Sequence, residues 1–202
     1  WCMKNKIPDF AYHMTKFFTE YLPIQRNLSP NSIATYRDTF RLLLLFYDTE
    51  KHIKPNLLTL DMLDVQGIED FMLWLKKERN CGASTCNQRL GALKSFFRYL
   101  QFALPDRALQ CQENLAIRPM KQSEPGLKYL TIDGIKLLLE QPDIKTKYGR
   151  RDLAILSLMY DTGARVQEIA DIKIVHIRFS APATIRITGK GDKTRVVPLL
   201  SR

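Results

Sequence analysis

Three ionisable residues in the second half of the chain have types and positions that suit work on a phosphodiester. Arg165 follows Thr162-Gly163, a break after an apolar helix, so its guanidinium would lie close to apolar walls, where a bidentate contact with phosphate is strong. Glu168 lies three positions later, and a helix would place it on the same face as Arg165. Lys190 stands between two glycines in a turn between strands, where its ammonium could protonate a leaving oxygen.

Each feature also has an ordinary structural explanation. Arg165 and Glu168 at this spacing are typical of an ion pair at the start of a helix, and spacing alone favours that interpretation. An isolated Gly-Lys-Gly at 189–191 is typical of an exposed turn lysine. The combination is more specific than its parts. The order is an apolar helix, Thr-Gly-x-Arg-x-x-Glu, a spacer, and then Gly-Lys-Gly-x-Lys-x-Arg-x-Val-Pro-Leu.

The first half of the chain has strong helical periodicity. Apolar residues recur at helical spacing in four segments, 8–21, 29–51, 65–79 and 84–102. Ser29-Pro30 is typical of a cap followed by proline at the first helical position, and Ser84 can cap the last helix. Four amphipathic helices joined by short loops predict a compact bundle over residues 1–110.

The periodicity fades toward the middle of the chain, where several prolines fall among polar residues. We therefore expect a linker over 111–128 and a second domain over 129–202. In that domain the sequence predicts helices over 131–140 and 153–160 and, after the break at Thr162-Gly163, a short helix that ends at about 172. It also predicts strands over 184–188 and 194–199. The helix over 153–160 is almost wholly apolar and should be buried, with Tyr160 in the core.

Basic residues outnumber acidic ones. The formal net charge is +10 and the sequence pI is about 9.5, a surplus that favours nucleic acid as partner, and less often an acidic membrane surface. Residues 173–202 carry seven basic residues and one acidic residue, a net of +6. The hairpin is therefore suited to phosphate contacts, although a lysine-protected sheet edge would have the same charge.

The four cysteines are Cys2, Cys81, Cys86 and Cys111. They form no Cys-x-x-Cys pair and have no histidine cluster near them, so we expect reduced thiols of a cytoplasmic protein and no metal site. The longest apolar stretch, 42–47, is far shorter than the ~20 residues that cross a bilayer. We expect a cytoplasmic, nucleoid-associated protein without cofactor or membrane.

The order and spacing of the Arg165 motif and the Lys190 hairpin resemble the tyrosine recombinase family, which includes phage and transposon integrases and Xer-type recombinases. Residues 84–100 look like the last helix of that family's core-binding domain, and 32–47 are similar to its second helix. The resemblance implies a mainly α fold with a small β element. A four-helix core-binding (SAM-like) bundle would precede the first part of an α+β recombinase catalytic domain, and the two would clamp duplex DNA.

The resemblance also implies a mechanism. In this family a tyrosine attacks a backbone phosphate, forms a 3′-phosphotyrosyl link and releases a 5′-hydroxyl, with neither ATP nor a metal. Arg165 would then stabilise the charge on the pentacoordinate phosphate. Glu168 would support Arg165, and Lys190 would donate a proton to the leaving 5′-oxygen.

Further DNA contacts are expected from position. Two basic helices could enter the major groove, and the hairpin could hold the backbone, although each residue could equally be a solvated surface charge. The candidates are Arg37 and Arg41 in the second helix, Arg89 and Lys94 in the fourth, and Lys193 and Arg195 in the hairpin. The aromatic residues Phe96, Phe97 and Tyr99 are most simply core residues.

One part of the family pattern has no counterpart. The family continues past the hairpin with His-x-x-Arg, a further His or Trp and the nucleophilic Tyr, whereas His176-Ile177-Arg178 has the wrong spacing and precedes Lys190. We assign no nucleophile. The chain is therefore either part of a recombinase, tetrameric on two DNA sites when complete, or a shorter, monomeric regulator that occupies recombination sites. A helical protein whose partner is not DNA is a third possibility.

Overall fold

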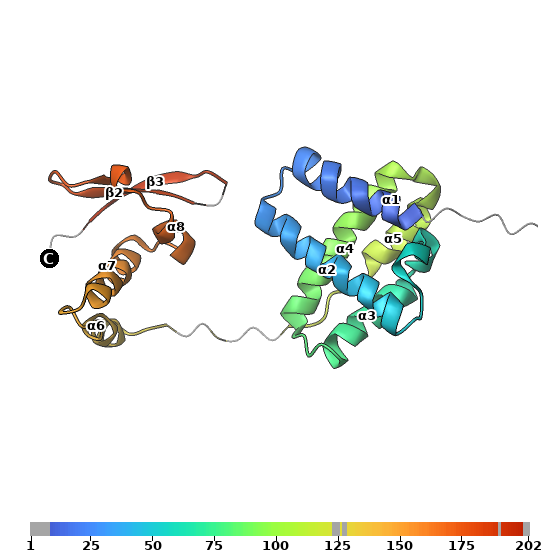
Figure 1. Cartoon of the computed structure of the whole chain (residues 1–202), viewed down its shortest axis with the longest axis horizontal. Coiled ribbons are helices and arrows are strands. Elements are labelled where there is room, and N and C mark those ends of the chain that lie inside the picture. The colour runs from blue at the N-terminus through green and yellow to red at the C-terminus, as the bar shows by residue number, and fades with distance from the viewer. Residues whose placement is uncertain (1–8, 123–125, 127–128, 190, 200–202) are drawn as a thin grey trace, which may run out of the picture. The chain divides into compact units, whose positions relative to one another are not determined.

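The computed structural model of the chain divides into two units, Trp1–Glu124 and Pro125–Arg202 (Figure 1). The structure describes residues 9–122, 126, 129–189 and 191–199. Each unit has a hydrophobic cluster of its own.

The described part of the first unit is a bundle of five α-helices. They are α1 (Asp9–Lys16), α2 (Pro30–Thr49), α3 (Val65–Lys77), α4 (Ala83–Ala103) and α5 (Ala108–Ala116). A π-helical segment, η1 (Phe17–Gln25), continues α1, and short 3₁₀ turns lie at η2 (Pro55–Leu57), η3 (Leu60–Met62) and η4 (Pro105–Arg107). The prediction of a helical bundle is confirmed, and the structure adds a fifth helix.

Local sequence explains most helix boundaries. Ser29 caps α2, with Pro30 in the first turn, as the sequence predicts. The wide turns of η1 include Pro23, which has no N–H for an ordinary helical hydrogen bond. The expected cap at Ser84 is wrong, because Gly82 holds the extended conformation of the capping position and Ser84 already lies within α4.

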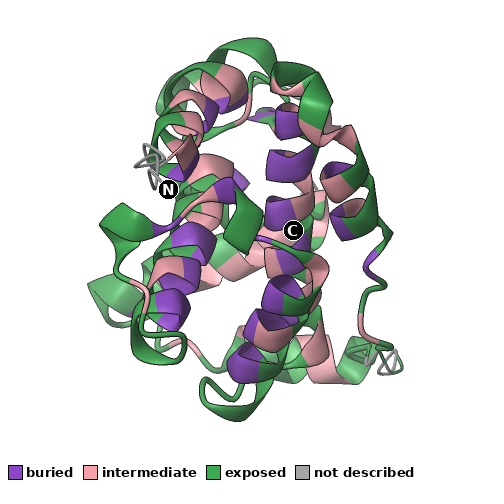
Figure 2. Cartoon of the chain, turned by 90° about the vertical axis from the view of Figure 1, so that its right-hand side faces the viewer, coloured by how far each residue is buried: buried purple, intermediate pink, exposed green. Residues whose placement is uncertain are grey.

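Helix α4 contacts α2, α3 and α5 and carries much of the core. Phe96 and Phe97 are buried, as the sequence predicts, and the Phe96 ring lies 5.2 Å from that of Phe17 and 5.2 Å from that of Phe40. Figure 2 shows the buried positions facing the inside of the bundle. These aromatic side chains therefore hold the bundle together and are not available to stack on bases.

The region expected to be a linker begins inside this bundle. Cys111 and Asn114 are buried in α5, and the Asn114 amide donates to Leu63 O at 2.9 Å. After α5 the chain stays on α4, where the side-chain amide of Asn87 exchanges two hydrogen bonds with the backbone of Met120, at 2.9 and 2.8 Å. Residues 111–120 thus belong to the first unit, because a short amphipathic helix and backbone contacts fix them there.

The second unit combines helices with a small sheet. Its described elements are α6 (Ile132–Glu140), α7 (Lys147–Thr162), α8 (Val166–Ala170), η5 (Ile174–His176), β1 (Ile177–Arg178), β2 (Thr184–Thr188) and β3 (Thr194–Pro198). The strands are antiparallel in the order β1-β2-β3, and α8 contacts β2. The mainly α fold with a small β element is confirmed.

The expectation of a buried helix over 153–160 is wrong for the described structure. None of these residues is buried, and Tyr160 is 48% exposed rather than a core residue. The buried hydrophobic residues of this unit are Ala164, Ile185 and Ile187. Leu158 packs against them, but the described sheet is too small to cover the rest of the apolar surface of α7.

Candidate active site and nucleic-acid interface

A glycine break positions Arg165. Helix α7 ends at Gly163, which has a left-handed φ of 58° and donates its N–H to Met159 O at 2.9 Å. The chain then passes through buried Ala164, and Arg165 becomes the capping residue of α8 with an extended backbone. The Thr-Gly-x-Arg motif is therefore a turn between two helices, and it places Arg165 at the start of α8.

Glu168 holds Arg165 from the first turn of α8. Its Oε2 accepts from the Arg165 backbone N–H at 3.1 Å, and its Oε1 accepts from Arg165 Nη1 at 2.8 Å. The Glu168 side chain is 6% exposed, whereas that of Arg165 is 75% exposed. Apolar walls do not enclose Arg165 as we expected. Instead, the buried Glu168 carboxylate accepts a hydrogen bond from one nitrogen of the exposed guanidinium. The other N–H donors of Arg165 remain available to an anion.

A second arginine reaches the same carboxylate from the sheet. Arg195 Nη2 donates to Glu168 Oε2 at 2.9 Å. The base of the hairpin lies against Glu168 as well, because a Cβ on Gly189 would come within 2.8 Å of Glu168 Oε1. The Gly189 N–H donates to Lys193 O at 2.8 Å and closes the turn. The sequence analysis did not predict this contact, because the face on which Arg195 lies depends on the register that pairs it with Ile187 of β2.

These contacts fix the charge of the site. The hydrogen bond from Arg195, followed by those from the backbone and side chain of Arg165, lowers the pKa of Glu168 to about 2. The carboxylate is therefore ionised at neutral pH and balances one of the two guanidinium groups. The three side chains together carry one net positive charge, which suits a phosphate.

The hairpin turn carries the other two candidates. Gly191 and Asp192 have left-handed φ values of 75° and 60°, and Lys193 is exposed. Lys190, the expected proton donor, lies outside the described residues. Lys193 is thus accessible to a DNA backbone, whereas Arg195 has already committed one nitrogen to Glu168.

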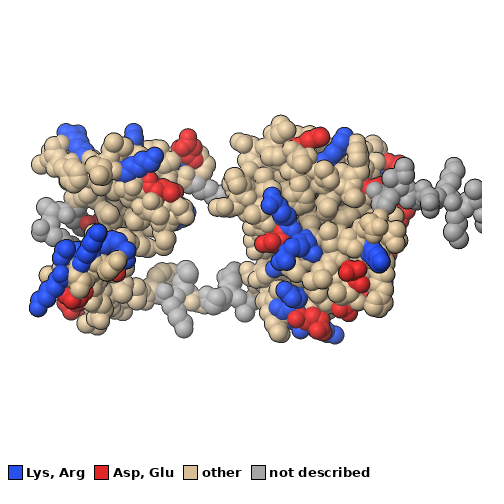
Figure 3. All heavy atoms as spheres, viewed as in Figure 1, with Lys and Arg blue, Asp and Glu red and all other residues tan. Residues whose placement is uncertain are grey.

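The candidates on α2 are accessible. Arg37 and Arg41 are exposed, and the Arg41 guanidinium lies 3.9 Å from the equally exposed Asp38. Such a loose surface pair stabilises little and leaves the guanidinium available. Figure 3 shows basic side chains gathered on the face of the first unit along which α2 runs in Figure 1.

The candidates on α4 are already engaged or partly buried. Lys94 Nζ donates to Ile117 O at 2.6 Å, and burial lowers the pKa of its ammonium. Arg89 is half-buried, and its Nε is buried without a hydrogen-bond partner among the described residues. Lys94 therefore fixes the chain after α5 rather than extending into solvent.

The described residues show neither a metal-binding cluster nor a membrane span. No three or more His, Cys, Asp and Glu side chains come together there as a metal site would require. The described helices include none with the length and apolar character of a membrane span.

Solved structures with a similar fold define the class. The chain superposes on XerH site-specific recombinase bound to its palindromic difH substrate with a TM-score of 0.59 and 22% identity, over 85% of this chain and 49% of that one. It superposes on the Tn1549 transposon integrase in complex with circular intermediate DNA with a TM-score of 0.60 and 14% identity, over 92% and 60%. The fold is that of site-specific recombinases.

Two sequence models match most of the chain. The "Phage integrase, N-terminal SAM-like domain" matches residues 16–102, and the "Phage integrase family" matches residues 128–202. The chain belongs to the phage integrase family of tyrosine recombinases, as its motifs predict.

Curated relatives agree with this assignment. The chain is 36% identical over 194 residues to a Sinorhizobium fredii protein named as integrase/recombinase y4rC. The aligned region covers 96% of this chain and 58% of that protein. It is 32% identical over 185 residues to the tyrosine recombinase XerD of Listeria monocytogenes, over 90% of this chain and 58% of that one. The chain thus spans less than two thirds of the length of these relatives.

Proposed function

We propose that this chain is the DNA-binding and partial catalytic region of a tyrosine-type site-specific recombinase. The complete enzyme would cleave and rejoin DNA strands through a 3′-phosphotyrosyl intermediate. The observation that carries the proposal is the exposed Arg165 guanidinium held by the buried Glu168 carboxylate, inside the segment that matches the phage integrase family. This arrangement offers oriented donors to a phosphate before it binds, and such donors need no rearrangement as charge develops.

Each candidate residue then has a role. Arg165 binds the reacting phosphate, Glu168 orients Arg165, and Lys190 protonates the leaving 5′-oxygen. The backbone contacts come from the exposed Lys193 in the hairpin and the exposed Arg37 and Arg41 on α2, with a further contact from the half-buried Arg89 on α4. Because most of these are phosphate contacts, they supply affinity and register rather than sequence recognition.

The partner is a duplex recombination site. The net charge of +10 supports a polyanionic partner, and the matched Tn1549 integrase was solved in complex with circular intermediate DNA. The complete protein would act at the nucleoid in the cytoplasm, as a tetramer on two DNA sites, whereas this chain alone is a monomer. Light scattering of the chain with and without duplex tests the last statement.

A salt titration of duplex binding tests the proposal. We expect the logarithm of the binding constant to fall linearly with the logarithm of salt concentration, and Arg165→Gln to make the slope shallower by about 0.9 for the lost phosphate contact. Arg151→Gln is the matched control, since Arg151 pairs with Asp152 on α7. Binding that is undetectable at low salt for the unaltered chain would refute the proposal.

A suicide duplex separates binding from strand cleavage. We expect retention without covalent attachment, because no tyrosine in this sequence follows a His-x-x-Arg motif. A covalent adduct would show that a tyrosine of this chain is the nucleophile, and peptide mapping would identify it.

A further inference from the structure

Residues along each strand of the hairpin alternate between an inner face, toward the buried cluster of the second unit, and an outer face. Ile185 and Ile187 of β2 are buried, and their partners across the strands are Val197 and Arg195. Arg195 therefore lies on the inner face of the sheet. Arg186 lies between the two isoleucines on β2 and is exposed, so it belongs to the outer face.

We infer that Arg195 is a positioning residue, which ties the start of the hairpin turn at Gly189 to Arg165 through the shared carboxylate of Glu168, and that it is not itself a DNA backbone contact. The consequence for catalysis rests on the proposed function. The tie itself rests only on contacts within this chain.

The shared carboxylate makes the two sides of the site dependent on each other. Glu168 Oε2 accepts from Arg195 Nη2 and from the Arg165 backbone, and Oε1 accepts from Arg165 Nη1. If the hairpin moved outward, the bond from Arg195 would break and a carboxylate that is 6% exposed would keep only Arg165. An under-paired buried charge is unfavourable, so the hairpin is held at one distance from Arg165.

Gly189 allows the hairpin backbone to lie in close contact with Glu168. A Cβ at this position would lie 2.8 Å from Glu168 Oε1 and 3.7 Å from Arg195 Nη1, so the hairpin backbone lies directly against the pair. Lys190 is the next residue in sequence. The described contacts hold Gly189 against the Arg195–Glu168 pair, and the proposed function needs a proton donor close to this point to act on a phosphate bound by Arg165.

Carboxyl NMR titration of Glu168 in the whole chain tests the tie without DNA. We expect Arg195→Gln to raise the pKa of Glu168 by about one unit or more, because a charged donor is lost. Arg195→Lys should restore part of the shift, and Arg186→Gln, the same change on the outer face, should leave it unchanged. An unchanged Glu168 titration in Arg195→Gln would overturn the inference. If Arg195→Gln loses the sheet signals of Ile185 and Ile187, Arg195→Lys is compared with the unaltered chain instead. A higher pKa of Glu168 in Arg195→Lys then supports the inference, and an unchanged pKa overturns it.

Salt titration of duplex binding tests the second part. We expect Lys193→Gln to make the slope shallower by about 0.9 and Arg195→Gln to keep the slope of the unaltered chain. An equal loss of slope in both variants would contradict the inference, because Arg195 would then be a phosphate contact. If the unaltered chain binds no duplex, the proposed function fails, whereas the Glu168 titration still decides whether the tie exists.

Discussion

A single buried carboxylate, that of Glu168, receives hydrogen bonds from arginines on two different elements. Arg165 alone at a helix start would be a flexible surface side chain, and its rotamer freedom would be lost on binding. The Glu168 contacts restrict one edge of its guanidinium before any ligand arrives. At the scale of residues, the candidate site is therefore a set of donors held by one acceptor.

The low pKa of Glu168 predicts a pH dependence of the second unit. The folded value of about 2 lies below the ordinary 4.5, so ionisation of Glu168 stabilises the folded unit above pH 4.5, and this contribution is lost as the pH falls toward 2. We expect the midpoint temperature of unfolding of the second unit to decrease as the pH is lowered from 4.5 toward 2. The NMR intensities of β2 and β3 amides measure this midpoint. In Glu168→Gln the decline in this window should be smaller, and an identical decline would contradict the assignment.

Gly189→Ala is predicted to destabilise the second unit, because the atom it would meet belongs to a side chain that two arginines hold. Its Cβ would meet Glu168 Oε1 at 2.8 Å, so Gly189→Ala must displace the carboxylate or the hairpin, at a cost of about 1–3 kcal/mol in the free energy of unfolding. Denaturant unfolding of the second unit measures this cost.

A second glycine serves as the control for this substitution. Gly91 is exposed within α4 and a Cβ there would meet nothing within 4 Å, so Gly91→Ala should stabilise the first unit by about 1 kcal/mol. Equal effects of the two substitutions would show that the close approach at Gly189 is unimportant.

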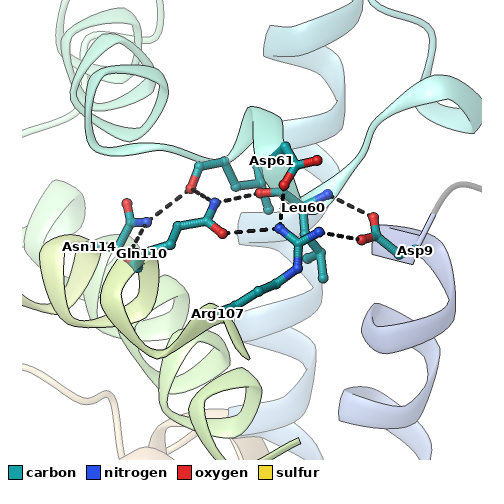
Figure 4. Close-up of polar contacts among 7 residues, drawn as sticks. Asp9, Leu60, Asp61, Arg107, Gln110 and Asn114 are labelled. Carbon is teal, nitrogen blue, oxygen red and sulfur yellow. Dashed lines mark hydrogen bonds and ion pairs between the residues drawn. The ribbon is translucent and has the colours of Figure 1, made fainter. Parts of the chain in front are cut away.

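At the scale of elements, Arg107 joins segments that are distant in the sequence. Its guanidinium donates to Asp9 Oδ2 at 3.1 Å and pairs with Asp61, at the starts of α1 and η3 (Figure 4). Nearby, the Gln110 amide donates to Leu60 O at 2.6 Å. These contacts help to hold the short amphipathic helix α5 on the bundle.

Loss of Arg107 should loosen α5. We expect Arg107→Met to lower the free energy of unfolding of the first unit by about 1–2 kcal/mol, because the half-buried Asp9 and the exposed Asp61 both lose a charged donor. Exchange of the α5 amides should quicken more than that of the α3 amides. Arg118→Met, at an exposed position after α5, is the charge-matched control, and an equal effect there would contradict the role of Arg107.

At the scale of the molecule, the two units differ in how much core they have. The first unit buries a large aromatic and aliphatic cluster around α4, whereas the described part of the second buries three hydrophobic residues, Ala164, Ile185 and Ile187. Buried apolar area is the main source of stability, so the second unit should open more readily.

Hydrogen exchange on the whole chain checks this difference. We expect the amides of α4 to exchange at least tenfold more slowly than those of α7, a ratio that corresponds to about 1.4 kcal/mol or more. Gly91→Ala should slow exchange in α4 and leave α7 unchanged, since the two helices belong to different units. Equal protection of α4 and α7 would show that stability does not follow the size of the two cores.

Local chemistry in the sequence was enough to predict many features. Proline, serine and glycine at helix ends gave α2 and the Thr162-Gly163 break, period-2 alternation gave β2, and the order of the Arg165 and Lys190 motifs gave the family. Each of these depends on a few neighbouring residues, whose backbone preferences act over one or two turns.

Tertiary structure alone decided the rest. Which distant segments meet decides that α5 is partly buried and α7 exposed. It also decides that Lys94 donates to Ile117 O and Arg195 to Glu168. A basic residue in sequence carries the same charge whether it faces DNA, a carboxylate or a backbone carbonyl. Only packing brings one of these partners within hydrogen-bond distance, and that distance decides whether the charge is free to bind a phosphate.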